Sequence, residues 1–534
     1  MPNNVGDKIL QLDRDQEEVQ AKIKAEALKM PYINLSGRHI DENILKLIPK
    51  EQIEGLQCVP IALAGHLLTV GVVDPQSQGV VDGLKTLQEM TGYQIKTALV
   101  SATSFAYGKK SYDLLVKTNE GERPVVLDSK NQDELLQLSA QLKSGKVDRE
   151  VTVSDLFLAI MAEAVQQKSS DIHFEPDSES LKIRFRIDGV LHLVMERPTG
   201  DYHGLESRIK YLAKMPLSAT SKPQDGRFTI QVSDAALDLR VASLPTVYGE
   251  MMVIRILNQS QVMLPLSQLG LRPDLEQMAR SAFTKPHGLI LVTGPTGSGK
   301  TTTLYAILQE LNTPERKIIT IEDPVEYKIA GLEQSQVDAE RGYDFVDALR
   351  GALRQDPDII MIGEIRDKET ANIGIRAALT GHIVLATLHS NTAPASYSRL
   401  LEMEIEPFLF SGSINLIIAQ RLVRLLCPNC KKGREVTSQE AKTFQKEIGR
   451  IPSQIFDAVG CSQCRNIGYS GRTAILEAFT PSRAIEQMAI LQASVADFEQ
   501  QAHKDGMITM TQDGLLKVEQ GITTISEIYR VTAE

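Results

Sequence analysis

The chain has 534 residues, of which 42% are hydrophobic and 24% are charged, and its formal net charge is −10. This composition is typical of a globular protein of about three or four domains, and its acidic balance argues against a general nucleic-acid coat protein, although it is compatible with a local basic groove. No apolar run approaches the roughly 18 residues of a membrane span, and the charged N-terminus lacks the apolar core of a signal peptide, so we expect a cytoplasmic protein.

The first part of the chain, residues 1–108, is predicted to be a small α+β domain. Residues 1–30 are expected to form one charged amphipathic helix, and short strand-like and helical runs alternate from there to about residue 100. Cys58 lies in an apolar run, which indicates a buried small side chain rather than a reactive thiol. The polar segment 109–150 has few aromatic residues and is predicted to be a linker with one helix over residues 132–143.

A second unit is predicted over residues 151–265. It begins with a helix over residues 153–167. The strands that follow are expected at Asp171–Glu175, Leu181–Ile187, Leu191–Glu196, Arg227–Val232, Leu237–Ser243 and Met251–Leu257. A third unit, residues 266–534, has the alternating strand and helix signals that are typical of a parallel α/β sheet.

The most informative motif of the third unit is Gly294–Thr301, which fits the pattern G-x-x-x-x-G-K-[ST]. It follows the apolar run Leu289–Val292 and precedes a helix-forming stretch, which is the context that a phosphate-binding loop requires. Glycines let backbone N–H groups point at one anion, and the helix N-terminus adds its positive end. Lys300 is expected to reach the β- and γ-phosphates, and the Thr301 hydroxyl to bind Mg²⁺. The full predicted nucleotide-binding set is Gly294, Pro295, Thr296, Gly297, Ser298, Gly299, Lys300 and Thr301.

Two further apolar runs of this unit end in acids. Ile318–Ile321 is followed by Glu322 and Asp323, and Asp358–Gly363 is followed by Glu364. Strands of an α/β sheet place their chemistry at their carboxyl ends, where carboxylates can hold Mg²⁺ or polarise an attacking water. The alternative is that these acids are merely solvated at the sheet edge. Two such clusters after a phosphate-binding loop favour the functional interpretation.

Histidines stand on either side of a further apolar strand, His382 before it and His389 after it. His389 therefore falls at a third strand end of the same unit, where it can sense a γ-phosphate through a hydrogen bond. The alternative is a packing role, which is the commoner role of a lone histidine.

Ordered segments of the chain resemble a known family, the secretion ATPase superfamily of type II secretion and type IV pilus assembly. Its Walker A, Asp box, Walker B and His box correspond, in that order, to Gly294–Tyr305, Ile318–Tyr327, Leu353–Asp367 and Thr380–Ala393. Segments that look like its second N-terminal domain are Ser170–Pro176, Arg184–His192, Pro223–Arg227 and Asp238–Ser243. The resemblance covers nearly everything from residue 151 onwards, and four ordered motifs make it specific.

The resemblance implies an α/β fold that works as a hexameric ring. A RecA-like P-loop ATPase domain would span residues 266–534, preceded by a PAS-like α+β domain and the small N-terminal α+β domain. It also implies that Glu364 is the general base for the attacking water. Glu322 and Asp323 would shape the metal and water site.

The same resemblance implies roles for two histidines and two arginines. His382 and His389 would couple the nucleotide state to the domain interface. Arg227 and Arg240, on strands of the second unit, would reach the nucleotide phosphates, either within the chain or across a subunit boundary. Ordinary salt bridging is an equally weighted alternative for both arginines.

Four of the five cysteines form two C-x-x-C pairs, Cys427 with Cys430 and Cys461 with Cys464. In a cytosolic protein this spacing favours a metal over disulfides, and four thiolates can close a tetrahedral Zn²⁺ site. The polar stretch between the pairs is longer than usual and is expected to loop out. Unmetallated or redox-active cysteines are the alternative. The family's assembly and secretion members carry such a module, here residues 427–472, whereas its retraction motors usually lack it.

The segment from Leu28 onwards resembles part of the family's first N-terminal domain. In some pilus motors that domain binds cyclic di-GMP through R-L-G-type motifs near its start. Residues 1–30 contain no such motif. We therefore expect a shortened domain that does not bind cyclic di-GMP and docks instead on a membrane-anchored partner.

The resemblance leads to a functional hypothesis. The chain would be a cytoplasmic homohexamer that hydrolyses ATP with Mg²⁺ to power assembly of a type IV pilus, reaching the inner membrane through a platform protein and accessory proteins. A type II secretion ATPase is the alternative, since the resemblance implies that both branches share every catalytic residue named above. A DNA-transfer ring ATPase and a nucleotide-binding scaffold without turnover are less favoured, and no nucleic-acid partner is expected.

Overall fold

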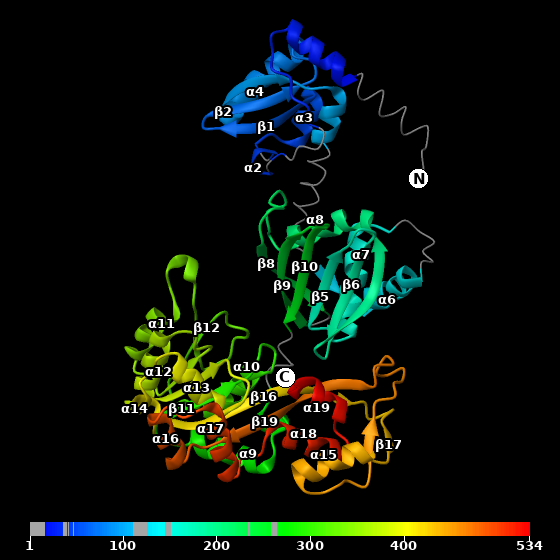
Figure 1. Cartoon of the computed structure of the whole chain (residues 1–534). Coiled ribbons are helices and arrows are strands. Elements are labelled where there is room, and N and C mark those ends of the chain that lie inside the picture. The colour runs from blue at the N-terminus through cyan, green and yellow to red at the C-terminus, as the bar shows by residue number, and fades with distance from the viewer. Residues whose placement is uncertain are drawn as a thin grey trace. The chain divides into compact units, whose positions relative to one another are not determined.

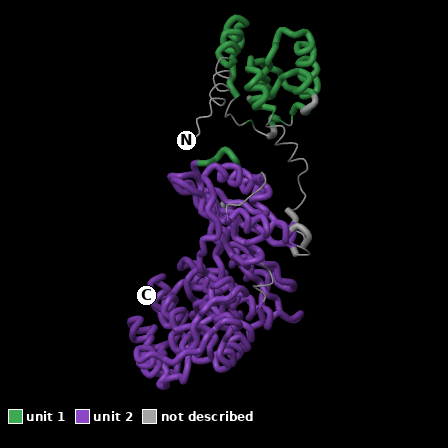
Figure 2. The backbone as a smooth tube through the Cα atoms, turned by 90° about the vertical axis from the view of Figure 1, so that its right-hand side faces the viewer, with its two compact units in different colours: residues 1–126, 216–220 green, residues 127–215, 221–534 purple. Residues whose placement is uncertain are grey.

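The structure, a computed structural model of the chain, describes residues 17–35, 40, 42–45, 47–109, 125–127, 129–144, 151–232, 235–257 and 264–533. The chain divides into unit 1, residues 1–126 with 216–220, and unit 2, residues 127–215 with 221–534 (Figure 2). The first part of the predicted N-terminal helix, up to residue 16, lies outside the described residues. So do residues 110–124 and 145–150 of the predicted linker.

Unit 1 contains a three-stranded sheet in the order β1-β2-β3, in which β1 and β2 are antiparallel and β2 and β3 are parallel. Its elements are α2 (Glu42–Leu45), α3 (Lys50–Leu56), β1 (Cys58–Ala64), β2 (Leu67–Val72), α4 (Gln78–Thr91) and β3 (Gln94–Leu99). Residues 17–27 and 102–109 are also helical. Cys58 is wholly buried, which confirms the prediction of a buried small side chain, and burial raises the pKa of its thiol to about 12.

The first half of unit 2 is built on a largely antiparallel sheet of order β4-β8-β9-β10-β5-β6-β7. The six strands predicted for this region are all present. Its elements are β4 (Val125–Leu127), α6 (Ser129–Ser144), α7 (Val153–Gln166), β5 (Asp171–Pro176), β6 (Ser180–Ile187), β7 (Val190–Pro198), α8 (Tyr202–Leu212), β8 (Gln224–Val232), β9 (Ala235–Thr246) and β10 (Gly249–Leu257). We refer to residues 151–257 as the second domain.

Helices α6 and α7 pack together in this half of unit 2. Ser139 and Lys143 of α6 both hydrogen-bond to the carboxylate of Glu163, which is buried on α7. Thr152 is the N-cap of helix α7: its side chain accepts from the Asp155 N–H while the Asp155 carboxylate accepts from the Thr152 N–H. The helix predicted over residues 132–143 is therefore present as α6, but it belongs to a packed unit rather than to a free linker.

The second half of unit 2 carries a sheet of order β13-β12-β14-β15-β11-β16-β19, parallel except for β19. Its strands are β11 (Gly288–Thr293), β12 (Ile318–Glu322), β13 (Glu333–Gln336), β14 (Ile359–Ile362), β15 (Ile383–Leu388), β16 (Ile414–Leu426) and β19 (Tyr469–Phe479). Every residue of β11, β12, β14 and β15 is buried, because helices cover both faces of a parallel sheet. We refer to residues 264–533 as the ATPase domain, after the domain that the family resemblance implies for this part of the chain.

Helices lie between many of the strands of this domain, and the last four helices follow its final strand. These helices are α9 (Pro273–Phe283), α10 (Lys300–Leu311), α11 (Phe345–Leu353), α12 (Lys368–Leu379), α13 (Ala395–Glu402), α14 (Pro407–Phe410), α16 (Arg483–Ile490), α17 (Val495–Lys504), α18 (Met510–Glu519) and α19 (Ile525–Thr532). Among the helices that the structure describes, none is both long and apolar enough to cross a bilayer.

Strands β16 and β19 extend beyond the sheet to a small module that carries β17 and α15 (Figure 1). The module, residues 427–472, contains β17 (Lys432–Arg434), α15 (Ser438–Ile448) and β18 (Ile455–Asp457), with β17 and β18 paired. Helix α15 starts at Thr437, which forms a reciprocal cap with Glu440. The stretch that was expected to loop out is therefore folded, and the β17–β18 pair closes the long gap between the two cysteine pairs.

Candidate functional site

The loop after β11 has the backbone of an anion-binding cradle. Gly294, Gly297 and Gly299 have φ of 139°, 78° and 88°, a region in which side chains other than glycine are strained. A Cβ at Gly294 would lie 2.5 Å from the Gln420 carbonyl oxygen, so this glycine also allows a close approach to β16. Helix α10 begins at Lys300, directly after the loop, and its free N–H groups therefore face the loop.

Lys300 and Ser298 place polar atoms inside this cradle. The Lys300 ammonium donates to the carbonyl oxygens of Gly294, at 2.8 Å, and Pro295, at 3.1 Å. Burial lowers the pKa of Lys300, and the negative charge of Glu364 opposes that shift. The Ser298 hydroxyl is buried and has no hydrogen-bond partner among the described residues. A half-buried ammonium and an unpartnered hydroxyl fit an anion with several oxygens, such as a nucleotide phosphate.

Gln420, which the sequence patterns did not single out, supports the cradle from behind. It lies in the middle of β16 and is 1% exposed. Its amide donates to the Ser298 carbonyl at 2.6 Å and accepts from the Thr303 hydroxyl at 2.8 Å. One side chain thus joins the loop to the first turn of α10. The signal in the sequence that could have identified Gln420 is that it is a polar residue in a largely apolar run.

The acids and one histidine meet at the carboxyl edge of the sheet. β14 and β15 are neighbouring parallel strands, so Glu364 and His389, which follow them, lie together: His389 Nε2 is 2.7 Å from Glu364 Oε1. The Arg366 guanidinium donates to the other Glu364 oxygen at 2.7 Å and lies 3.4 Å from Asp323. Three of the predicted site residues, Glu364, Asp323 and His389, are therefore brought together.

Glu322 has a different environment. It ends β12, is 3% exposed, and accepts hydrogen bonds from the Tyr305 and Thr320 hydroxyls and from the Gln334 amide. Burial, reinforced by the Glu322 charge, raises the pKa of Tyr305, which keeps the phenol protonated as a donor. Both acids line the cavity, but both carboxylate oxygens of Glu322 are engaged by neutral donors, whereas those of Glu364 contact a charged arginine and a histidine.

His382 does not join this group. It precedes β15, and its Nδ1 lies 3.0 Å from the Ala377 carbonyl oxygen at the amino edge of the sheet. The six residues of β15 separate it from His389, a span of about 20 Å. His382 therefore lies at the opposite end of β15 from His389, and a role in coupling the nucleotide state to the domain interface stays a prediction for both histidines.

Arg227 and Arg240 stand opposite each other on β8 and β9. The Arg240 guanidinium lies 3.2 Å from a Glu326 carboxylate oxygen and donates to the Val325 carbonyl at 3.2 Å, so it contacts the loop after β12. The Arg227 side chain is exposed. Neither arginine lines the cavity around the glycine loop.

That cavity has a volume of about 1150 Å³ and lies between the two halves of unit 2. The ATPase domain contributes the glycine loop, the acids and His389. Six other arginines line the cavity in place of the two predicted ones. Arg186 and Arg255 come from the second domain, and the ATPase domain contributes Arg366, Arg421, Arg472 and Arg530. The pattern of apolar and polar residues along the sequence could not show that these six arginines, and not others on strands and helices, line the cavity.

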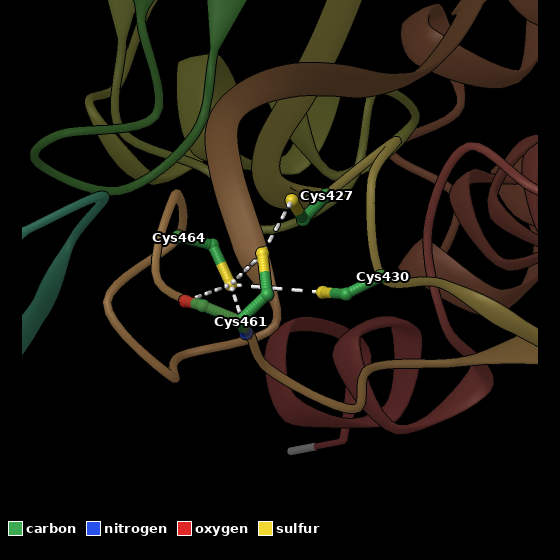
Figure 3. Close-up of side chains that lie close together, drawn as sticks. All are labelled: Cys427, Cys430, Cys461 and Cys464. Atoms are coloured by element: carbon green, nitrogen blue, oxygen red, sulfur yellow. Dashed lines mark hydrogen bonds between the residues drawn. The ribbon is translucent and has the colours of Figure 1, made fainter.

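The four paired cysteines converge in the module (Figure 3). Their sulfur atoms all lie within 4.8 Å of one another. The Sγ–Sγ distances are 4.0 Å for Cys427 and Cys461, 3.6 Å for Cys430 and Cys464, and 3.7 Å for Cys461 and Cys464. Four thiolates at about 2.3 Å from a tetrahedral Zn²⁺ stand about 3.8 Å apart, so this donor set fits that ion.

Backbone N–H groups also favour the thiolate form of one of these cysteines, Cys464. The N–H groups of Cys461 and Gly468 point at the Cys464 sulfur, at 3.1 and 3.2 Å. Burial opposes ionisation of this thiol, but these hydrogen bonds and the neighbouring cysteines lower its pKa to about 6. Thiolate is the form that binds metal.

Comparison with known proteins places this site in a family. The family model for "Type II/IV secretion system protein" matches residues 146–530, which is well over half of the chain. The chain belongs to this family. The MshEN domain model matches residues 28–107 of unit 1. The family resemblance expected from the four motifs is thus confirmed.

Relatives within the family include assembly and secretion proteins. The chain is 41% identical over 519 residues to the type IV pilus assembly ATPase PilB of Myxococcus xanthus, covering 94% of this chain and 89% of that protein. It is 42% identical over 416 residues to the type II secretion system protein E of Aeromonas hydrophila, covering 77% and 83%. The crystal structure of the ATPase DotB of Legionella pneumophila shares the fold, with a TM-score of 0.53 at 22% identity, covering 72% of this chain and 97% of that one.

Proposed function

We propose that this member of the secretion family hydrolyses ATP to power assembly of a type IV pilus. The observation that carries the proposal is the convergence of the glycine loop, Glu364 and His389 in one cavity, three features that come from three adjacent strands. The relation to a type IV pilus assembly ATPase over 94% of the chain supports the choice of fibre. A type II secretion ATPase is the second candidate, since a type II secretion protein is 42% identical.

Binding of ATP is assigned to residues 294–301. The glycine loop and the start of α10 would hold the phosphates through backbone N–H groups, and Lys300 would contact the β- and γ-phosphates. The Thr301 hydroxyl, which lines the cavity, would bind Mg²⁺, whose charge offsets that of the phosphates. Gln420 would keep the loop in its binding geometry.

Proton transfer from the attacking water is assigned to Glu364. Its carboxylate lines the cavity, and His389 and Arg366 hold its two oxygens in place. Asp323, beside Arg366, would take part in the metal and water shell. Glu322, with both oxygens already hydrogen-bonded, would position β12 and Tyr305 rather than accept the proton.

A homohexameric ring is part of the proposal. Arg227 and Arg240 do not line the cavity of their own chain, and Arg227 is exposed, which supports a role at the nucleotide of a neighbouring subunit. Opening and closing of the cavity between the second domain and the ATPase domain would pass motion round the ring. The second domain, which we compare with PAS-like domains because helices accompany an antiparallel sheet, would be the moving part.

The surroundings of the motor are proposed from the same relatives. The chain would act in the cytoplasm, bound at the inner membrane to a platform protein and accessory assembly proteins, with unit 1 as the docking domain and without cyclic di-GMP. The cysteine module would hold a structural Zn²⁺, which the sulfur distances support. No nucleic-acid partner is proposed.

A phosphate-release assay on the purified chain tests the function. Lys300→Ala should abolish turnover with an unchanged circular dichroism spectrum, and absence of turnover in the native chain would refute the proposal. Stimulation by single-stranded DNA that disappears at higher salt would favour a DNA motor instead. Deletion of the gene in its host should remove a pilus; loss of protein secretion with pili intact would select the type II alternative.

A further inference from the structure

The cysteine module contacts the second domain at the C-terminal end of α7. The Arg465 guanidinium donates to the carbonyl oxygens of Gln167, at 3.0 Å, and Gln166, at 2.6 Å. These are carbonyls of the last turn of α7, which have no partner within the helix. A cation at this end also complements the negative pole of the helix dipole. Arg465 therefore acts as a cap for a helix that lies far away in the sequence.

A second contact lies in the turn between β6 and β7. The Gly471 N–H donates to a carboxylate oxygen of Asp188 at 2.8 Å. Asp188 and Gly189, which form that turn, also line the cavity around the glycine loop. The module thus holds two separate points of the second domain, one of which is part of the cavity wall.

The direction of the Arg465 side chain depends on the turn that carries Cys461 and Cys464. Arg465 and Asn466 both have left-handed backbone conformations, with φ of 54° and 61°. The Asn466 N–H donates to the Cys461 carbonyl at 2.8 Å, and the Cys461 N–H donates to the Cys464 sulfur at 3.1 Å. The turn that carries Cys461 and Cys464 therefore sets where the arginine points.

The module is also tied to the segment of the ATPase domain just before α19. The Lys431 ammonium donates to the Gly521 carbonyl at 2.8 Å, and next to the module the N–H of Leu426, the last residue of β16, donates to the Ile522 carbonyl at 2.8 Å. Helix α19 follows, and its Arg530 lines the cavity. The module is consequently bonded to the β6–β7 turn, which lines the cavity, and to the segment before α19, the helix that carries the lining residue Arg530.

We propose that Arg465 is a positioning residue of the ATPase, which through its cap on α7 holds the second domain over the glycine loop when the cavity is closed. The inference rests on the proposed ATP hydrolysis at that loop. In this arrangement the cysteine module is a clasp, by which we mean that it is hydrogen-bonded both to the second domain and to the segment before α19. Loss of Arg465 should loosen the second domain without disturbing the parallel sheet or the cysteine cluster.

Arg465→Ala tests the clasp, with Arg450→Ala as the matched control. Arg450 is in the same module but pairs with Glu519 on the surface of the ATPase domain. We expect Arg465→Ala to raise the KM for ATP about tenfold, with a smaller change in kcat, because two hydrogen bonds to a charged group are lost. Arg465→Lys should give an intermediate KM, and Arg450→Ala should leave it unchanged.

Hydrogen–deuterium exchange on the full chain supplies the second readout. Arg465→Ala should speed exchange in residues 187–190 and at Gly471, leave β11 and β15 unchanged, and keep the native metal content. Native exchange and native KM in Arg465→Ala would overturn the proposal. A native chain without ATP turnover would refute the proposed function alone, since the exchange comparison tests the clasp without any activity.

Discussion

His389 Nε2 lies 2.7 Å from a carboxylate oxygen of Glu364, although the two residues follow different strands. The contact exists because β14 and β15 are adjacent and parallel, so their carboxyl ends meet at one edge of the sheet. It fixes the direction of the carboxylate in the cavity. Replacing either Glu364 or His389 should therefore change the rate of ATP hydrolysis.

Replacing Glu364 by Gln should lower kcat by about 10²–10⁴, because an amide cannot take a proton from the attacking water. The fold and ATP binding should persist, since Gln keeps the shape and one acceptor oxygen. Turnover by phosphate release and ATP affinity by calorimetry measure the two effects. Retained turnover in Glu364→Gln together with lost turnover in Glu322→Gln would transfer the base role to Glu322.

Replacing His389 by Ala should lower kcat by roughly tenfold, because Glu364 loses one of the two groups that orient it. His382→Ala is the matched control: it changes the same residue type at the opposite end of the same strand, and kcat should stay native. Steady-state ATP hydrolysis decides between them. If kcat fell equally in the two variants, the loss would come from a disturbed β15 and not from the contact between His389 and Glu364.

Replacing Gln420 by Glu should weaken ATP binding by about tenfold. The side chain keeps its size, but an oxygen replaces the amide group that donates to the Ser298 carbonyl, so two acceptors face each other in a buried place. Calorimetric titration with a non-hydrolysable ATP analogue measures the change. Gln501→Ala, which removes an exposed amide from α17, serves as control and should bind normally. Native affinity in Gln420→Glu would show that the loop holds its shape alone.

The native chain should contain one zinc ion per chain, as measured by elemental analysis after dialysis. Cys461→Ser should abolish it, because oxygen is a poor substitute in a four-sulfur site. Cys58→Ala should retain it, since Cys58 lies buried in unit 1 and its thiol is not part of the cluster. A metal-free native chain in which the four thiols are all titratable would instead support unmetallated cysteines.

Glu527 should make unit 2 sensitive to acid. Burial opposes its ionisation, but Arg530 and Arg424 outweigh burial and lower its pKa from 4.5 to about 2. Because the folded pKa lies below the unfolded one, the stabilisation is fully present above about pH 4.5 and is lost as the pH falls towards 2.

Glu527→Gln should therefore reduce the free energy of unfolding at pH 7 by roughly 2–3 kcal/mol, and the difference from the native chain should shrink below pH 4.5. Denaturant unfolding at pH 7 and at pH 3 measures it. Glu519→Gln, which breaks a surface pair with Arg450, should cost less than about 1 kcal/mol. A Glu527→Gln deficit that is the same at both pH values would contradict the charge argument.

Much of this site was predictable from short segments of sequence. The Gly294–Thr301 pattern, the acids after apolar runs and the two C-x-x-C pairs are local signals, because each feature requires particular residue types at fixed spacing. The strands that deliver them were also predictable, since buried parallel strands are continuous apolar runs. For the same reason the family resemblance could be stated before any fold was known.

Other parts of the site depend on how distant segments meet. Gln420 and Arg465 act on residues that are remote in sequence, and nothing in their neighbourhood marks the partner. The different environments of Glu322 and Glu364 follow from which side chains surround each strand end, and the separation of His382 from His389 follows from strand direction.

The sequence by itself determined most of the strands, the phosphate-binding loop, the candidate acids and the cysteine pairs, because these follow from local backbone and side-chain chemistry. The tertiary structure alone decided which partners each acid has, which arginines line the cavity and what the cysteine module contacts. Those outcomes depend on strand order and on the packing of the second domain against the ATPase domain. No local pattern encodes them, because each contact joins residues that only the folded chain brings within hydrogen-bonding distance.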